Sequence, residues 1–154
     1  MSDLDASLSR FSRQIGQESS VHRARLDREA VEAFGRSVSW EIPGEVPPSF
    51  LTRFREGEFE LLVSLGVELR QVLHAEQEYR WLAPLKADAQ LDHRARLADV
   101  LSKGGKGGRL TFLKFDSEYL DPVTTRALAQ SRTVMVIRES VDGPAASQSQ
   151  GEPQ

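Results

Sequence analysis

The chain has 154 residues, a formal net charge of −3 and no cysteine, which favours one domain and excludes disulfides and thiolate metal ligands. The acidic balance argues against a nucleic-acid partner. No apolar run approaches the roughly 20 residues that span a bilayer, and the N-terminus lacks an apolar signal core, so a cytoplasmic protein without membrane contact is expected.

Composition divides the chain into three parts. Residues 1–20 are polar and predict a mobile leader, with at most a short helix. Residues 21–140 carry the periodic apolar patterns of a folded domain. Residues 141–154 are rich in glycine, serine, glutamine and proline and predict a disordered tail.

The first half of the domain predicts a short edge strand and two helices. The strand is expected at 21–26, and Asp27 is typical of an N-cap before a helix at about 28–38. After a proline-rich loop, residues 49–65 predict an apolar core helix that Gly57 divides in two and Gly66 ends. Ser49 is its expected cap, with Thr52 as an alternative.

The second half predicts four long strands, at 67–82, 89–101, 110–120 and 126–138, and Asp121-Pro122 is expected to start the turn between the last two. The first alternates with period two, and five residues are expected on one half-buried face: Leu73, Ala75, Gln77, Tyr79 and Trp81. We expect it to pair with the second strand as an antiparallel meander. Long antiparallel strands after an apolar helix predict an α+β fold, a curved antiparallel sheet wrapped around a central helix. The open edge of such a sheet favours dimerisation.

Residues 102–108, Ser-Lys-Gly-Gly-Lys-Gly-Gly, lie between two predicted strands. The pattern favours a flexible hairpin tip, and it lacks the Gly-Lys-Ser/Thr ending of a phosphate-binding Walker loop. The alternative is a mobile basic flap, in which Lys103, Lys106 and Arg109 contact the phosphates of a nucleotide-bearing ligand.

The titratable residues give weaker signals. His22, His74 and His93 lack metal-ligand spacing and favour structural roles, although His74 and His93 are expected on neighbouring strands. Glu76 and Glu78 share a strand face, which favours cross-strand ion pairs with arginines, namely Arg80, Arg94 and Arg96. Three glutamates of the central helix predict a solvated face, or one of them points into a site: Glu56, Glu58 and Glu60.

Several segments resemble one family. Residues 74–79, His-Ala-Glu-Gln-Glu-Tyr, and 84–88, Pro-Leu-Lys-Ala-Asp, are similar to MaoC-like hydratases of the hot-dog fold. The segments 47–50, 103–112 and 134–138 resemble the helix entry, hairpin and last strand of that family. The branch that the chain most resembles is the N-terminal MaoC dehydratase domain, also found as the accessory subunit of heterodimeric (3R)-hydroxyacyl dehydratases. The resemblance covers about residues 20–140.

This resemblance implies a ligand, an acyl chain carried on coenzyme A or acyl carrier protein, and no separate cofactor. Active members carry Asp-x-Asn-Pro-x-His after the first helix, and its Asp and His add water to an enoyl thioester or remove it. Here the corresponding stretch, residues 36–46, has Glu41 and Glu45 as its only acids and no histidine. No catalytic residue is therefore assigned, and the resemblance implies a non-catalytic hot-dog subunit that completes the site of a catalytic partner.

Substrate contacts are predicted at two places. Phe50, Leu51 and Phe54 are expected to line the acyl tunnel, although packing in the core is the commoner role of helix apolars. Lys103 and Lys106 are expected at the phosphates. The expected partner is a second hot-dog subunit or a second copy. The alternatives are a hot-dog acyl-CoA thioesterase that uses a helix glutamate as general base, and a non-enzymatic acyl-thioester-binding subunit.

Overall fold

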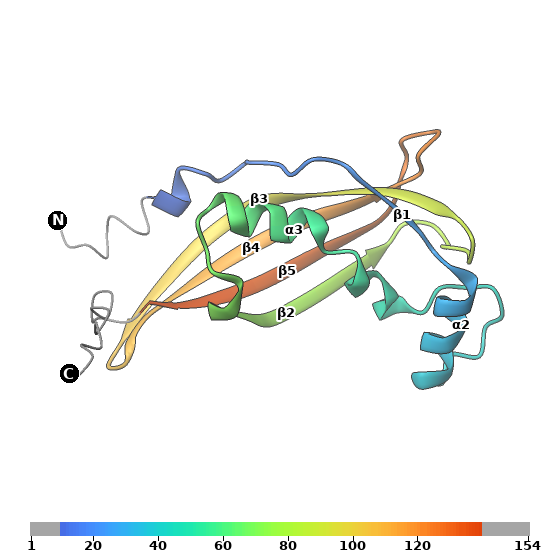
Figure 1. The fold of residues 1–154 in the computed structure, drawn as a ribbon, viewed down its shortest axis with the longest axis horizontal. Coiled ribbons are helices and arrows are strands. Elements are labelled where there is room, and N and C mark those ends of the chain that lie inside the picture. The colour runs from blue at the N-terminus through green and yellow to red at the C-terminus, as the bar shows by residue number, and fades with distance from the viewer. Residues whose placement is uncertain (1–9, 140–154) are drawn as a thin grey trace, which may run out of the picture.

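The computed structural model describes residues 10–139. One antiparallel sheet has the order β1-β3-β4-β5-β2, with bounds β1 His22–Arg25, β2 Val72–Trp81, β3 Gln90–Gly105, β4 Gly108–Leu120 and β5 Ala127–Glu139. The helices are α2 (Arg28–Ser37) and α3 (Glu56–Ser64), with 3-10 turns η1 (Pro48–Arg53) and η2 (Leu69–Gln71). The curved sheet runs the length of the molecule with α3 across one face (Figure 1). The predicted α+β fold, a curved sheet around a central helix, is confirmed.

The core has two parts, both between the sheet and its helical layer. Beneath α3, the helix residues Leu61 and Leu62 pack on strand residues that include Leu97, Phe115 and Met135. The second cluster lies beneath η1 and α2 and includes Leu26, Val31, Phe50, Leu51, Leu91 and Tyr119. Strand residues that face the core therefore alternate with charged residues that face away, as a one-sided sheet requires.

The helices follow their sequence signals with one change. The Asp27 carboxylate accepts a hydrogen bond from the Ala30 backbone N–H at 3.0 Å, which confirms the cap and the helix it starts. The predicted core helix is divided as expected, but between η1 and α3 rather than at Gly57, and no side chain caps either piece. Gly57 lies in the first turn of α3, where a Cβ atom would lie 3.0 Å from the Ala95 backbone nitrogen of β3. Gly66 follows α3 with φ of +70°, the conformation that a glycine at this position favours.

The pairing of β2 differs from the prediction. β2 pairs with β5 and lies at the opposite edge of the sheet from β1 and β3, so the expected pairing of the first two long strands is wrong. Residues 82–89 form a link too long for a tight hairpin, whereas short turns join β3 to β4 and β4 to β5. The register of β2 also shifts between His74 and Glu76, and the bulge turns Leu73 outward to 68% exposure. The expected face holds only after the bulge, where Gln77, Tyr79 and Trp81 are half-buried.

The glycine-rich segment is mostly strand. β3 continues to Gly105 and β4 begins at Gly108, so the predicted hairpin is present but its turn is only residues 106–107 rather than 102–108. Glycine tolerates the pleated ladder at the end of a hairpin, and Gly108 uses a φ of +113°. At the other end, the Asp121 carboxylate accepts hydrogen bonds from the backbone N–H groups of Val123 and Thr124, which confirms the predicted turn.

Part of the predicted leader packs on the domain. Phe11 is 1% exposed and belongs to the core beneath α3. The backbone of residues 16–19 bonds to β3, with Gly16 N–H on the Leu97 carbonyl and Ser19 N–H on the Ala95 carbonyl, each at 2.8 Å. This segment extends the cover that β1 gives to the edge of β3. The rest of the leader and the tail at 141–154 lie outside the described residues. Within residues 10–139, no helix is long and apolar enough to cross a membrane.

Candidate functional site

The first turns of α3 hold three glutamates over a polar strip of the sheet. Glu58 is 3% exposed; one of its carboxylate oxygens accepts from the Arg55 guanidinium at 2.8 Å and the other from the Thr133 hydroxyl at 2.6 Å. The prediction of a solvated face is therefore wrong for Glu58. A helix that approaches the sheet as closely as Gly57 allows brings the adjacent side chain into the interior, where a carboxylate needs such partners.

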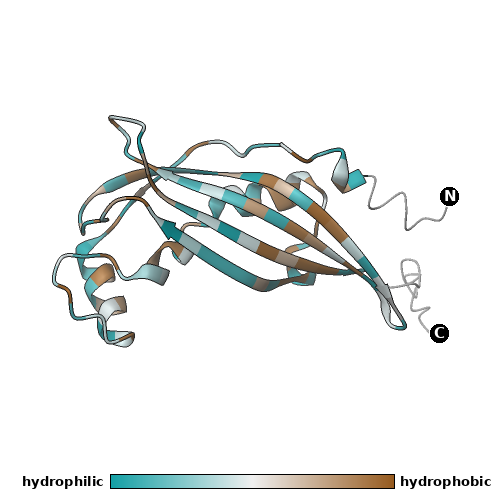
Figure 2. Ribbon diagram, turned by 180° about the vertical axis from the view of Figure 1, so that it is seen from behind, coloured by the Kyte–Doolittle hydropathy of each residue, from teal (hydrophilic) through white to brown (hydrophobic). Residues whose placement is uncertain are grey.

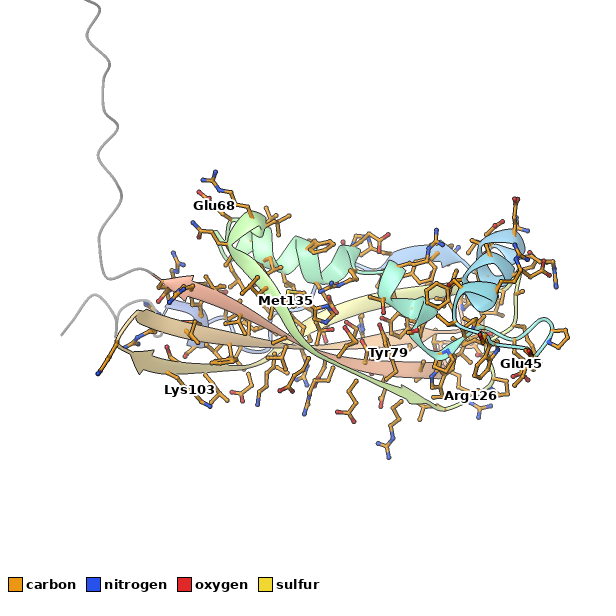
Figure 3. The ribbon with its side chains drawn as sticks, turned by 90° about the horizontal axis from the view of Figure 1, so that it is seen from below. Glu45, Glu68, Tyr79, Lys103, Arg126 and Met135 are labelled. Carbon is orange, nitrogen blue, oxygen red and sulfur yellow. The ribbon has the colours of Figure 1, made fainter. Side chains whose placement is uncertain are left out.

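Other polar contacts tie the helical layer to β2 and β5. The Thr133 hydroxyl also lies 3.0 Å from the Gln77 side-chain oxygen, and Thr52 of η1 shares a 2.6 Å hydrogen bond with the Tyr79 hydroxyl. Tyr79 is drawn in Figure 3 between the two ends of the molecule. Its burial raises the pKa of the Tyr79 phenol above its ordinary value. The strip is thus a set of paired groups in the interior rather than a solvated groove.

Three aromatic rings form a row across adjacent strands on the same inner face. The register places His22 of β1 opposite His93 of β3, and His93 opposite Tyr119 of β4. The His22 and His93 rings stack at 5.5 Å between centroids, and the His93 and Tyr119 rings at 6.0 Å. The predicted neighbourhood of His74 and His93 is wrong because β1, not β2, flanks β3. His74 lies on the other edge, exposed, with its ring nitrogen 3.2 Å from the Glu76 carbonyl.

The outer glutamates of α3 face the two histidines. Glu60 accepts from the Ser20 hydroxyl at 2.6 Å and the Ser20 N–H at 2.9 Å, and it lies 2.8 Å from His22 Nε2. These bonds, those of Ser20 first, lower the pKa of Glu60 to about 2. Glu56 lies 3.4 Å from His93 Nε2, and burial lowers the pKa of the His93 imidazole. Burial likewise raises the pKa of Tyr119.

Ion pairs cover the outer face of the sheet, but not in the predicted combination. Arg94 bonds to Glu118 at 3.2 Å, and Asp116 accepts two hydrogen bonds from Arg132 and lies 3.9 Å from Arg96. Glu76 and Glu78 therefore do not pair with Arg94 or Arg96, since β2 is not beside β3. Charged residues border a broad hollow of ≈ 500 Å³ on this face, and hydrophilic and hydrophobic residues alternate along its strands (Figure 2).

The three predicted tunnel residues lie at the η1 end of the core. Phe50 and Leu51 are 1% and 0% exposed and belong to the second core cluster. Phe54 is half-buried; its ring lies 6.0 Å from that of Phe50 and 6.0 Å from that of His93. The role of these residues in an acyl tunnel stays a prediction.

The two predicted lysines lie elsewhere. Lys103 and Lys106 are exposed on the β3–β4 hairpin, and the Lys103 ammonium lies 5.6 Å from the centre of the Phe112 ring. The hairpin is at one end of the long sheet and η1 toward the other (Figures 1 and 3). The structure therefore separates the lysines from the predicted tunnel residues, and their contact with phosphates stays a prediction.

Residues 36–46, which correspond to the catalytic segment of active MaoC-like members, form the end of α2 and an exposed loop. Glu45 of this loop lies 3.7 Å from the Lys86 ammonium, and its backbone bridges to the same residue. The loop and α2 line a small cavity of ≈ 260 Å³. The residues around it offer carboxylates and the Arg36 guanidinium but no imidazole. Within residues 10–139, no group of three acidic, histidine or cysteine side chains is placed to hold a metal ion.

The row of His22, His93 and Tyr119 was not predicted from the sequence. One available signal was the period of two along β3. His93 is two positions from both of the buried residues Leu91 and Ala95, and so it shares their face. Alternation could not show that β1 is the strand beside β3, and this pairing is what places His22 next to His93.

Comparison with known proteins fits this fold. The family model for the FAS1-like, dehydratase domain region matches residues 13–126, and the chain belongs to that family. No curated protein matches the sequence. Among solved structures, the fold is similar to the ChsH1-ChsH2 complex from Mycobacterium tuberculosis, with a TM-score of 0.65 and 13% identity over 92% of this chain and 94% of that chain.

Two further structures extend the comparison. The HadBC (3R)-hydroxyacyl-ACP dehydratase complex from Mycobacterium tuberculosis has a TM-score of 0.63 and 13% identity, over 80% of this chain and 96% of that chain. A hypothetical thioesterase protein with coenzyme A from Streptococcus pneumoniae has a TM-score of 0.54 and 12% identity, over 82% and 83%. At such identities the likeness shows the fold. The resemblance to MaoC-like hot-dog dehydratases is confirmed.

Proposed function

We propose that the chain is a non-catalytic hot-dog subunit of an enoyl-thioester hydratase or (3R)-hydroxyacyl-thioester dehydratase. It completes the acyl-thioester site of a catalytic partner, with the acyl chain carried on coenzyme A or acyl carrier protein and no cofactor of its own, in the cytoplasm. The observation that carries the proposal is residues 36–46. In a chain of this family, the loop lacks the acid-base pair of active MaoC-like members, and Glu45 faces a lysine rather than a histidine.

An exposed apolar edge supports a partner of the same fold. β2 is an edge strand that pairs only with β5 among the described residues, and its Leu73 is 68% exposed. Phe59 and Val63, one turn apart on the same side of α3, are 42% and 64% exposed. Unpaired strand edges with exposed apolar side chains are joined or covered in stable proteins. The structures of the HadBC and ChsH1-ChsH2 complexes contain similar chains.

The test is reconstitution with a MaoC-like protein that carries Asp-x-Asn-Pro-x-His and is encoded next to this chain. We expect the isolated chain to show no hydration of crotonyl-CoA or longer enoyl-CoAs. The complex should be stable, bury at least about 1,200 Å² and be active, and activity should vanish when the partner's aspartate or histidine is replaced. Replacing His74 or Glu76 of this chain should cost much less. Hydration by the isolated chain at ordinary enzyme rates would show that a site has been missed.

A charged substitution on β2 tests whether this edge is the interface with the partner. Leu73→Asp places a carboxylate on the proposed interface and should weaken the complex by at least about tenfold in Kd. Val123→Asp is the matched control, because Val123 is 90% exposed in the β4–β5 turn, whereas Leu73 lies opposite Val136 toward the other end of β5. Equal effects of the two substitutions on the complex would place the partner elsewhere.

A thioesterase is the second candidate function, and Glu56 is the candidate for its general base. Glu58 and Glu60 are held by close hydrogen bonds, whereas the side chain of Glu56 is 54% exposed at the start of α3. Hydrolysis of an acyl-CoA panel by the isolated chain, lost in Glu56→Gln, would favour the thioesterase. Binding of acyl-CoA without turnover, alone or with a partner, would favour a non-enzymatic binding subunit.

A further inference from the structure

The outer face of the sheet, the side away from α3, carries four apolar side chains in one row near the β3–β4 hairpin. Leu113 and Met135 belong to the core, so the residues beside them on β4 and β5 face away from it. The strand register places four outward residues side by side across the sheet, and they form the apolar row: Leu101, Phe112, Val136 and Leu73. Figure 2 shows the sheet from this side, with α3 behind it.

The apolar row is exposed at both ends. Leu101 is 45% exposed and Leu73 68%, Phe112 is half-buried, and Val136 on the inner strand β5 is 8% exposed. Leu110, which is 38% exposed, extends the patch toward the hairpin. The solvated face of a one-sided sheet normally carries polar residues. A continuous apolar row across four strands of that face therefore marks an interaction surface.

A second row on the same face consists of charges of alternating sign. In order across β3, β4, β5 and β2, this charged row contains Arg96, Asp116, Arg132 and Glu78. Asp116 accepts two hydrogen bonds from Arg132, at 2.8 and 3.0 Å. The ends of the row have spare capacity. Arg96 lies 3.9 Å from Asp116, and the Glu78 carboxylate makes no hydrogen bond or ion pair within residues 10–139.

Both rows are self-complementary under one two-fold rotation. In a symmetric dimer each copy presents the same surface to the other. When two outer faces stack about an axis parallel to the strands, midway between β4 and β5, β3 of one copy lies over β2 of the other. The apolar row then lies on itself, and Arg96 of each copy meets Glu78 of the other. An axis along the rows would instead place Arg96 on Arg96, so the charges select the first arrangement.

The outer face is large enough for a weak dimer. The two rows and the residues around them cover four strands about 4.8 Å apart and about eight residues of about 3.3 Å each. Such a patch measures roughly 500 Å² on each copy, or about 1,000 Å² in total, the lower limit for a specific interface. Facing sheets cross at about 30°, which shifts each row by only about 3 Å. The hollow of ≈ 500 Å³ among the charged residues leaves room for bridging water.

We propose that the outer face is a homodimer interface. Two copies of the chain stack with their apolar rows in contact and with an ion pair between Arg96 and Glu78 on each side of the two-fold axis. The occupant is a second copy rather than another protein because the charged row matches its own reversed order. The outer face and the proposed partner edge share only Leu73, so two complexes with the catalytic partner would join through it into a four-chain assembly.

The test is the mass of the isolated full chain, measured by sedimentation over a concentration series. We expect a concentration-dependent dimer. Phe112→Asp places a carboxylate within the apolar row and should weaken the dimer at least about tenfold in Kd. Phe59→Asp is the matched control and should leave the Kd unchanged. Phe59 is an exposed ring on α3, on the other face, and the Arg55 guanidinium lies 5.2 Å from its centre, much as Lys103 lies 5.6 Å from the centre of Phe112.

A mixing experiment tests the two-fold pairing without relying on a loss. Arg96→Glu alone places two glutamates at each contact, and Glu78→Arg alone places two arginines there, so each variant should dimerise at least about tenfold more weakly than the natural chain. An equal mixture of the two variants pairs opposite charges at both contacts. It should associate at least about tenfold more tightly than either variant alone, which only folded chains can do.

Three results would overturn the proposal. The first is a natural chain that stays monomeric at every concentration. The second is a dimer that Phe59→Asp weakens and Phe112→Asp does not, which would place the contact on the helical side. The third is a mixture that associates no better than its components. The proposed function does not depend on these outcomes, because it is tested by the activity of the reconstituted complex.

Discussion

The contact of Glu58 with the sheet is predicted to stabilise the position of α3. Glu58→Ala leaves the Arg55 guanidinium, whose side chain is 17% exposed, without its 2.8 Å partner, and leaves the fully buried Thr133 hydroxyl without its 2.6 Å partner. Removing one member of a buried ion pair costs about 3–5 kcal/mol, and the partial exposure of Arg55 favours about 3 kcal/mol. That is a large share of the about 5–15 kcal/mol stability of a typical domain.

The assay is urea unfolding followed by circular dichroism at pH 7. Glu58→Gln keeps the shape of the side chain and one acceptor oxygen, so it should lower the free energy of unfolding by less, about 1–2 kcal/mol. Thr133→Val should cost about 1 kcal/mol, and combining it with Glu58→Ala should show a coupling of at least about 0.5 kcal/mol. Glu32→Ala is the control, because its ion pair with Arg28 is exposed and 3.9 Å long. A loss below about 1 kcal/mol in Glu58→Ala, or full additivity, would refute the reasoning.

Four further outcomes are expected. Gly57→Ala places a methyl group against the β3 backbone and should cost about 1–3 kcal/mol in urea unfolding; an unchanged midpoint would contradict the close approach. Because the pKa of Glu60 is about 2 instead of 4.5, stability should fall as pH drops from 4.5 towards 2, and Glu60→Gln should flatten that part of the profile. Burial lowers the pKa of His93, so the unfolded chain binds a proton at this residue more readily than the folded chain does. Stability should therefore be complete above pH 6.5 and fall as the pH drops below 6.5, and His93→Phe should remove this fall. Lys103→Ala with Lys106→Ala should weaken coenzyme A thioester binding, more at low salt than at high salt, where exposed charges are screened; an unchanged Kd at low salt would leave a plain hairpin.

The elements that the sequence predicts well are those set by neighbouring residues. The Asp27 cap, Gly66 and the turn at Asp121 each form through contacts within a few positions, and the structure reproduces them. The predicted hairpin at residues 102–108 was too long because glycines that permit a turn also fit a ladder. Local patterns therefore fix where strands lie more reliably than where they end.

Strand pairing is decided by the whole sheet, and the errors in the predicted neighbours of His74, Glu76 and Glu78 follow from it. Period two shows that His93 faces the core. It does not show that β1 lies beside β3, or that β2 lies at the far edge of the sheet, three strands from β3. The bulge in β2, which exposes Leu73, leaves no clear mark in the sequence either. The expected ion pairs of Glu76 and Glu78 failed for the same reason, whereas the absence of an acid-base motif in residues 36–46 needed no pairing to be seen.

The same register explains how a chain without the acid-base motif can still hold a polar site. β1 joins β3 with His22 opposite His93, and the N-terminal segment that leads into β1 places Ser20 against Glu60. Glu60 is thereby bound to His22, and the buried His93 is left with Glu56 as its nearest charged group. Because β2 remains at the free edge, the proposed partner surface and the contact between His93 and Glu56 belong to different parts of the sheet. A substitution at Leu73 is therefore expected to disturb the proposed assembly without touching the contact between His93 and Glu56, and Glu56→Gln is expected to leave the edge unchanged.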